Sequence, residues 1–268
     1  MKIWKNTSTL DGFDEGLIFT DLKNEADIAL IGSKPIDVDE MPNLKAIFRA
    51  GIGRDNVPEK EAKEKGIVVR YPSQETIDII FDEAAGFTCS LIFHMLYSNV
   101  GTLDPWVKEP RRQLSQQNLL VIGTGKIGTR VTKLMKPFMN VITFEILQNK
   151  ASELKQMIQN ADCITIHIPK SDDNLSFIDA EKLSWMKSGS VLINTARGAI
   201  VDEEALYTEL ENHRLKAAFD VYWQEPYMGE LKKFYPDRFF MTPHVASACS
   251  EFIQGCRKDI DNLINDLS

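Results

Sequence analysis

The sequence predicts an α/β protein built on parallel sheets. Short apolar runs alternate along the chain with polar, helix-forming stretches, which is the pattern of successive strand–helix units. One of these units, at 119–138, contains glycines with the spacing G-x-G-x-x-G. With 268 residues, of which 43% are hydrophobic and 26% charged, the chain is long enough for two globular domains.

Composition also narrows the class of partner. The formal net charge of −8 and a pI near 5.2 argue against a nucleic-acid surface or a polybasic membrane patch. A small polar metabolite is the expected partner. The four cysteines are scattered without a C-x-x-C pair, so neither a metal site nor a disulfide framework is predicted. The N-terminus lacks the apolar core of a signal peptide, and we expect a cytoplasmic protein.

The N-terminal region is predicted to hold four strands, near 3–4, 27–31, 44–48 and 67–69, and an exposed helix at 57–66. The third strand leads into FRAGIGRDN, residues 48–56. Backbone N–H groups of Gly51 and Gly53 could bind a carboxylate there, beside Arg49 and Arg54. A tight strand-to-helix turn with solvated arginines explains this segment equally well.

A largely apolar helix is predicted from about 76 to 98. Gly101, Pro105 and Pro110 then break the helical pattern, and a polar run leads into the next strand. This break is the first predicted domain boundary.

The glycine-rich turn at 123–128 follows a buried strand, 119–122, and opens a helix. A dinucleotide pyrophosphate needs free backbone N–H groups at the positive end of a helix. The first glycine makes the turn, the second lets the diphosphate approach, and the third lets the helix lie against its strand. A glycine-rich connection without a nucleotide is the competing interpretation. The predicted cofactor segment comprises Gly123, Gly125, Lys126, Ile127 and Gly128.

The next strand, 141–144, ends at Glu145. A carboxylate at that place accepts hydrogen bonds from the adenosine ribose and repels a 2′-phosphate, so NAD is favoured over NADP. Two later strands, 161–169 and 190–195, place His167, Pro169 and Thr195 at carboxyl ends, where ligands of doubly wound sheets gather. A histidine such as His167, taken alone, is more often structural than catalytic.

Three residues at the ends of later strands combine into a candidate catalytic site: Arg197, Glu225 and His244. The arginine can clamp a carboxylate and polarise an adjacent carbonyl, while the histidine exchanges a proton with the resulting hydroxyl. The glutamate would orient the imidazole and favour its charged form. Each residue alone also has an ordinary surface or packing explanation.

The chain resembles the D-isomer-specific 2-hydroxyacid dehydrogenase family. The resemblance rests on six segments that occur in the family's order: RAGIGRDN, VIGTGKIG, ADCITIHIP, NTARGAIVDEEAL, FDVYWQEP and TPHVA. The resemblance extends from about residue 27 to residue 250, and a match of that length is far more specific than any single motif.

The resemblance implies a role for each matching residue. Arg197 would bind the substrate carboxylate and carbonyl, His244 would be the acid/base, and Glu225 its partner. Asp220 matches an acidic residue near the nicotinamide amide. The loop whose amides hold the substrate carboxylate is matched by Ala50, Gly51, Ile52 and Gly53.

The fold implied by the resemblance has two Rossmann-like, doubly wound parallel-sheet domains. The NAD-binding domain, 96–245, is inserted in a flavodoxin-like substrate domain, 1–95 and 246–268. The resemblance also implies that the region corresponding to 98–118 contributes to a dimer interface in relatives. This segment is short here, so the sequence leaves open whether the chain forms a homodimer.

The implied reaction is hydride transfer between a nicotinamide and C2 of a 2-hydroxy or 2-oxo acid. The sequence RAG around Arg49 resembles the phosphoglycerate dehydrogenases of the family, where such an arginine holds the distal phosphate, and Arg70 or Lys34 could add to that pocket. D-3-phosphoglycerate is therefore the leading substrate, and glyoxylate or hydroxypyruvate reduction is the alternative. A rival of another class is a non-enzymatic NAD(H)-sensing binding protein of the same fold.

Overall fold

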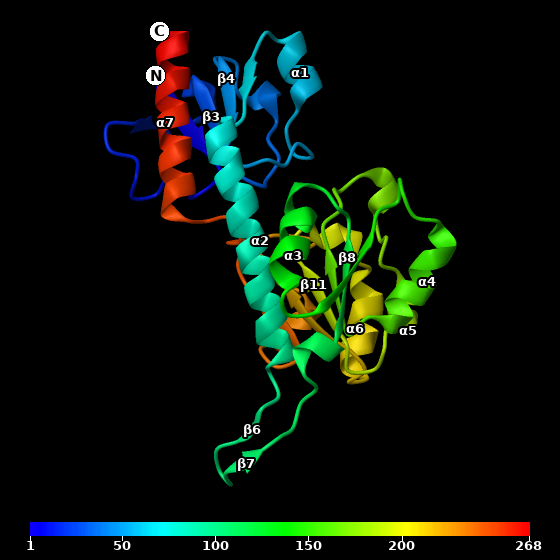
Figure 1. The fold of residues 1–268 in the computed structure, drawn as a ribbon. Helices are drawn as coiled ribbons and strands as arrows, with labels where there is room; N and C mark the ends of the chain where they lie inside the picture. Colours follow the sequence, from blue (N-terminus) through cyan, green and yellow to red (C-terminus); the bar gives the residue numbers. More distant parts are fainter. The chain divides into compact units, whose positions relative to one another are not determined.

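The computed structural model confirms the α/β class, with two parallel sheets, and describes residues 1–268 apart from the side chain of residue 151. The chain divides into two units, Met1–Glu83 with Ser247–Ser268, and Ala84–Ala246. Both termini lie in the first unit (Figure 1). Helix α2, Gln74–Leu96, contains the division at 83/84, whereas the boundary predicted from the sequence lies at the end of the same helix.

The first unit contains a five-stranded sheet in the order β2-β1-β3-β4-β5, with every pair parallel. Ile28 and Leu30 of β3 face one core, while Ala29 and Ile31 face the other, because side chains alternate across a strand. The strands are β1 Lys2–Lys5, β2 Ile18–Phe19, β3 Ile28–Ile31, β4 Ala46–Arg49 and β5 Val68–Arg70; helix α1 is Glu59–Glu64, with 3-10 turns at Lys23–Glu25 and Val38–Glu40.

Helix α7, Ser250–Leu267, is amphipathic and covers one face of this sheet. Its buried residues recur at helical spacing and pack with Ile28, Leu30 and Phe48. They are Phe252, Cys256, Ile260 and Leu263. The chain's last segment therefore completes the core that its first strands begin.

The second unit contains a six-stranded parallel sheet in the order β13-β12-β11-β10-β8-β9. Its strands are β8 Asn118–Ile122, β9 Asn140–Phe144, β10 Cys163–Ile166, β11 Val191–Asn194, β12 Lys216–Phe219 and β13 Phe239–Met241. Its helices are α3 Lys126–Met135, α4 Ala151–Asn160, α5 Ala180–Trp185 and α6 Glu203–Glu211, with 3-10 turns at Leu114–Gln116, Asp172–Asn174, Gly198–Ile200 and Glu230–Phe234.

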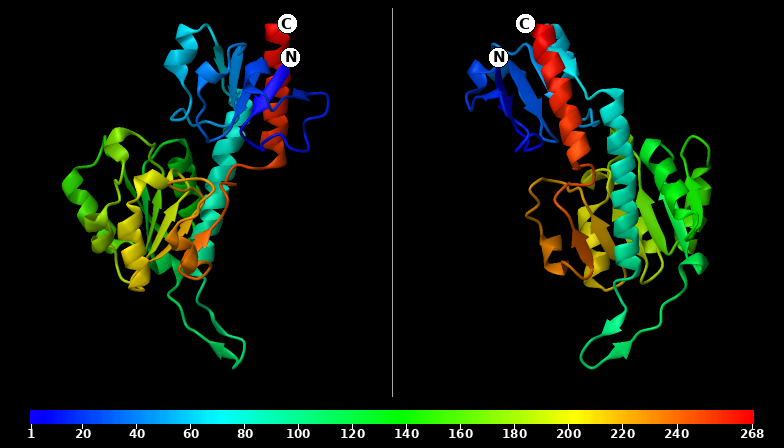
Figure 2. Two further views of the ribbon diagram at one scale, coloured as in Figure 1. Left: turned by 180° about the vertical axis from the view of Figure 1, so that it is seen from behind. Right: turned by 60° about the vertical axis from the view of Figure 1, so that its left-hand side comes forward.

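Helices cover both faces of this second sheet (Figures 1 and 2). Leu120 and Ile122 of β8 pack in the core that α4, α5 and α6 complete, and Leu119 and Val121 pack in the core shared with α2 and α3. A strand buried on both faces explains the continuous apolar run at 119–122.

Helix α2 is long and apolar enough to cross a membrane, but most of its apolar residues belong to the two cores. Ile80 packs in the first unit, whereas Ala85, Ile92 and Met95 pack in the second. The helix is therefore accounted for as a core helix of both units.

The segment after α2 forms a two-stranded antiparallel hairpin, β6 Gly101–Thr102 and β7 Val107–Lys108, which extends away from the sheet of the second unit (Figure 2). The sequence predicted only a break here. The apolar side chains of Leu103 and Trp106 are 80% and 75% exposed at its tip. The hairpin therefore presents two exposed apolar side chains close together in the sequence.

Candidate active site

The predicted catalytic residues follow three neighbouring strands of the second unit. Arg197 follows β11, Glu225 follows β12, and His244 follows β13; these strands pair in register as parallel neighbours. Since parallel strands end at the same edge of a sheet, all three residues lie along one edge. Most residues predicted for the cofactor follow β8, β9 and β10 on the adjoining half of this edge, while Thr195 and Asp220 follow β11 and β12.

His244 and Glu225 form the most direct contact of this edge. Nδ1 of His244 lies 2.8 Å from Oε2 and 3.0 Å from Oε1 of Glu225. The carboxylate accepts a hydrogen bond from Nδ1–H, which assigns the tautomer and fixes the ring plane. Among the residues that the structure describes, none hydrogen-bonds Nε2 of His244. That nitrogen is available for proton exchange.

The turn that carries His244 is held by Asp220, which is fully buried. Its carboxylate accepts hydrogen bonds from Oγ1 of Thr242 at 2.6 Å and from the backbone N–H groups of Val245 and Ala246 at 2.9 Å. Burial raises the pKa of Asp220, and these hydrogen bonds together with nearby His244 oppose that rise. Both carboxylate oxygens of Asp220 therefore accept hydrogen bonds from the turn that carries His244. The contact of Asp220 with the nicotinamide amide stays a prediction.

Arg197 begins a 3-10 turn that packs closely on the loop after β12. A Cβ atom on Gly198 would clash with backbone atoms of Tyr222 and Trp223, so only glycine fits there. Asn194 fastens the same turn by accepting from the N–H of Ala196 at 3.0 Å and donating to the carbonyl of Arg197 at 2.9 Å. Glycine at position 198 therefore lets the turn that carries Arg197 approach the loop that carries Glu225.

The glycine-rich turn has the geometry that a dinucleotide requires. Gly123 has φ +92°, and a Cβ there would lie 2.6 Å from the carbonyl oxygen of His167. A Cβ on Gly128 would clash with the carbonyl of Gly123. In contrast, Gly125 is exposed at the N-cap of α3, and a Cβ there would meet nothing within 4 Å. The space above the helix N-terminus thus fits a pyrophosphate, with Lys126 and Ile127 opening the helix.

Glu145 is linked directly to this turn by Thr124, which sequence reasoning did not single out. Oε2 of Glu145 accepts from the backbone N–H of Thr124 at 2.9 Å and from its hydroxyl at 3.0 Å. The hydrogen bond from the Thr124 N–H is the main cause that lowers the pKa of Glu145. A fixed, ionised carboxylate therefore stands beside the turn. A threonine between the first two glycines was the available signal.

His167 packs against the glycine turn through its backbone and Cβ. Burial lowers its pKa to about 3, and Nε2 lies 3.0 Å from the hydroxyl of Thr165. The ring is therefore neutral near pH 7 and fills a structural position. Nearby, the carbonyl of the exposed Pro169 accepts from Asn174, and the hydroxyl of Thr195 lies 2.8 Å from that of Thr88.

In the first unit, the predicted substrate loop follows β4. Arg49 is only 5% exposed, and its guanidinium folds over Gly51, which has φ +136°. Nη1 donates to the carbonyl of Ala50 at 2.5 Å, and Nε donates to Oδ1 of Asn56 at 3.3 Å. Arg49 thus braces the loop that contains Ile52 and Gly53. Both of these residues are partly exposed.

Asn56 is a second residue that the sequence did not single out. Its Nδ2 donates to the carbonyls of Gly32 at 2.7 Å and Lys34 at 3.0 Å, while its Oδ1 accepts from Arg49. One amide thereby joins the loops that follow β3 and β4. Its place at the end of a glycine-rich turn was the only available hint.

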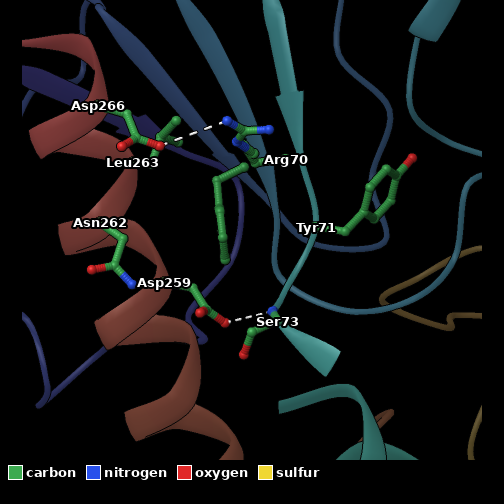
Figure 3. A pocket seen from close by; sticks show the side chains of 8 residues that line it. Arg70, Tyr71, Ser73, Asp259, Asn262, Leu263 and Asp266 are labelled. Carbon is green, nitrogen blue, oxygen red and sulfur yellow. Dashed lines mark hydrogen bonds and ion pairs between the residues drawn. The ribbon is translucent and has the colours of Figure 1, made fainter. Parts of the chain in front are cut away.

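The other arginines of this unit also have partners. Arg54 lies 4.6 Å over the ring of Tyr71 and 3.4 Å from Glu59. Arg70 lines a pocket of about 200 Å³ between β5 and α7, where it lies 3.6 Å from Asp266 (Figure 3). In the same pocket Asp259 accepts from the backbone N–H of Ser73, the residue before α2.

Comparison with known proteins points to one family. The sequence model described as the D-isomer specific 2-hydroxyacid dehydrogenase, NAD binding domain, matches residues 98–246, which lie within the second unit. A hydroxypyruvate reductase from Thermotoga maritima is 32% identical over 222 residues, covering 78% of this chain and 72% of the relative. A D-3-phosphoglycerate dehydrogenase from Synechocystis is 32% identical over 238 residues, covering 84% of this chain but 43% of the relative.

A solved structure supports the same fold. The D-lactate dehydrogenase of Aquifex aeolicus, complexed with NAD and lactic acid, superposes with a TM-score of 0.80 over 100% of this chain and 95% of that chain. The sequences are 22% identical, so this likeness concerns the fold alone.

Proposed function

Because the chain belongs to the D-isomer-specific 2-hydroxyacid dehydrogenase family and carries its NAD-binding domain, we propose that Arg197, Glu225 and His244 perform its oxidoreductase reaction. The observation that carries this proposal is the His244–Glu225 pair, joined at 2.8 Å at the ends of neighbouring strands. NADH, when bound, supplies a hydride to C2 of a 2-oxo acid.

Substrate binding and proton transfer are assigned to Arg197, His244 and Glu225. Arg197 binds the substrate carboxylate and polarises the carbonyl, since a guanidinium offers two parallel donors. His244 donates the proton from Nε2 to the carbonyl oxygen, and Glu225 holds the ring through Nδ1. In the first unit, the loop Ala50–Gly53 offers backbone amides suited to a carboxylate.

The cofactor is held by the glycine turn and its neighbours. The N-terminus of α3 at Gly125 binds the pyrophosphate, with Lys126 and Ile127 in its first turn, and Glu145 binds the adenosine ribose. Four further residues lie along the same sheet edge as the proposed cofactor segment. His167 packs against the glycine turn, and β10, β11 and β12 are followed by Pro169, Thr195 and Asp220.

For the substrate, the geometry supports a small unphosphorylated 2-oxo acid better than 3-phosphohydroxypyruvate. The hypothesis of a phosphorylated substrate depends on Arg49, because its guanidinium would bind the distal phosphate. That guanidinium is buried and hydrogen-bonded to Ala50 and Asn56. Arg54 and Arg70 are paired with Glu59 and Asp266. We therefore favour hydroxypyruvate or glyoxylate, in keeping with the relative named hydroxypyruvate reductase.

A steady-state comparison of hydroxypyruvate, glyoxylate and 3-phosphohydroxypyruvate with NADH tests this choice. We expect the highest kcat/KM with an unphosphorylated acid, and Arg49→Met should not alter the ratio between the phosphorylated and unphosphorylated substrates. A strong preference for 3-phosphohydroxypyruvate that Arg49→Met abolishes would restore D-3-phosphoglycerate. Silence with every 2-oxo acid, while NADH still binds, would favour the NAD(H)-sensing binding protein.

The exposed hairpin supports a homodimer as the working assembly. It occupies the region through which family members dimerise and exposes Leu103 and Trp106 at its tip. Apolar side chains this exposed are stabilised when a second protein surface covers them.

A further inference from the structure

Tyr222 lies beside both members of the histidine–glutamate pair without being assigned to the reaction. Its hydroxyl is 2.9 Å from the carbonyl oxygen of Thr242 and 2.8 Å from that of Phe219. Its backbone N–H donates to Oε1 of Glu225 at 3.2 Å. One residue at the end of β12 therefore contacts the Glu225 carboxylate and the loop after β13.

The carbonyl of Thr242 is part of the turn that presents His244. The backbone N–H of His244 donates to that same oxygen at 3.0 Å, and His244 has φ +56°. Such a backbone conformation is uncommon for a residue other than glycine and persists only where the surroundings hold it. The Tyr222 hydroxyl is one of the groups that hold this turn, together with buried Asp220.

The surroundings of Tyr222 keep its hydroxyl a donor. The side chain is half-buried, and its ring stacks on Tyr227 with centroids 5.1 Å apart. Burial raises the pKa of Tyr222 above its ordinary value, so the phenol stays protonated at neutral pH. The two acceptors nearest to this proton are both backbone carbonyls at strand ends.

We propose that Tyr222 is a positioning residue, whose hydroxyl fixes the turn at Thr242 so that His244 stays aligned with Glu225. The inference rests on the proposed acid/base role of His244. Acid/base catalysis depends on holding the proton donor within hydrogen-bond reach of the reacting oxygen, so a looser turn lowers turnover without weakening cofactor binding.

Tyr222→Phe removes the hydroxyl and keeps the ring. We expect kcat to fall about fivefold, the factor that corresponds to about 1 kcal/mol for one hydrogen bond, with the KM for NADH unchanged. Tyr227→Phe is the matched control, because it removes the hydroxyl of the ring stacked on Tyr222, which donates to Glu203 at 2.6 Å. Its kcat should remain that of the wild type. Activity is expressed per NADH-binding site, so that unfolded protein does not count.

A double-mutant cycle separates positioning from general packing. If Tyr222 acts through His244, Tyr222→Phe should have no further effect on the residual activity of His244→Ala. The inference is overturned if Tyr222→Phe keeps wild-type kcat, if Tyr227→Phe lowers kcat equally, or if the effects of Tyr222→Phe and His244→Ala multiply. A wild-type kcat in His244→Ala would instead refute the proposed function. That result differs from the three that overturn only the role of Tyr222.

Discussion

Nδ1 of His244 lies within hydrogen-bond distance of both carboxylate oxygens of Glu225, at 2.8 and 3.0 Å. The two residues follow adjacent parallel strands, and buried Asp220 anchors the turn that carries the histidine. This geometry leaves Nε2 as the nitrogen available to a substrate.

Arg197→Lys should lower kcat/KM for the 2-oxo acid by about 10- to 100-fold, because lysine cannot form the planar two-point clamp on a carboxylate. NADH affinity, followed by protein-to-nicotinamide energy transfer, should be retained. An unchanged kcat/KM in Arg197→Lys would show that the arginine does not bind the substrate carboxylate.

Thr124→Val should raise the KM for NADH about tenfold, since it removes a hydrogen bond to the charged Glu145 carboxylate. The kcat at saturating NADH should stay the same, because the proposed partner of Glu145 is the adenosine ribose, which takes no part in the hydride transfer. Thr208→Val, at an exposed position of α6, is the matched control. Equal KM values in both variants would contradict the positioning of Glu145 by Thr124.

His167 should make the protein less stable at mildly acidic pH. Its pKa is lowered to about 3 in the folded protein from an ordinary value of 6.5. Between these values the unfolded chain binds a proton that the folded chain does not, so the free energy of unfolding falls as the pH falls. The slope from this group is at most about 1.4 kcal/mol per pH unit.

Urea denaturation at about pH 7 and about pH 5 measures this effect. His167→Asn keeps a neutral polar group near Thr165 and should show a smaller loss of stability between the two pH values. If wild type and variant lose the same free energy, the folded protein does not hold His167 neutral.

Leu103→Ser combined with Trp106→Ser should shift a dimer to monomers, because both apolar side chains at the hairpin tip are removed. Size-exclusion chromatography with light scattering reads the mass directly. Met228→Ser, also 80% exposed but on another loop, should leave the mass unchanged. A wild-type protein that is monomeric at high concentration would refute the proposed homodimer.

The sequence patterns predicted the features that depend on spacing. The α/β class, the strand before the glycine turn, and the order of Arg197, Glu225 and His244 along strand ends follow from periodicity and motif position. The hairpin at 101–108 was missed because its strands are two residues long and carry no alternating pattern.

The direction in which individual side chains point could not be predicted from the sequence pattern. Arg49 looked suited to a phosphate, but its guanidinium turns toward Ala50 and Asn56. The hydroxyls of Thr124 and Tyr222 likewise find their partners, Glu145 and the carbonyl of Thr242, only after separate strands pair. Such contacts depend on tertiary structure, which no local spacing encodes.

Turnover of His244→Ala with hydroxypyruvate and NADH tests the central claim most directly. General acid/base catalysis contributes about 10²- to 10⁴-fold, so kcat should fall by that factor while NADH binding is retained. A variant that turns over at the wild-type rate would contradict the assignment of His244 as the proton donor and, with it, the proposed function of the His244–Glu225 pair.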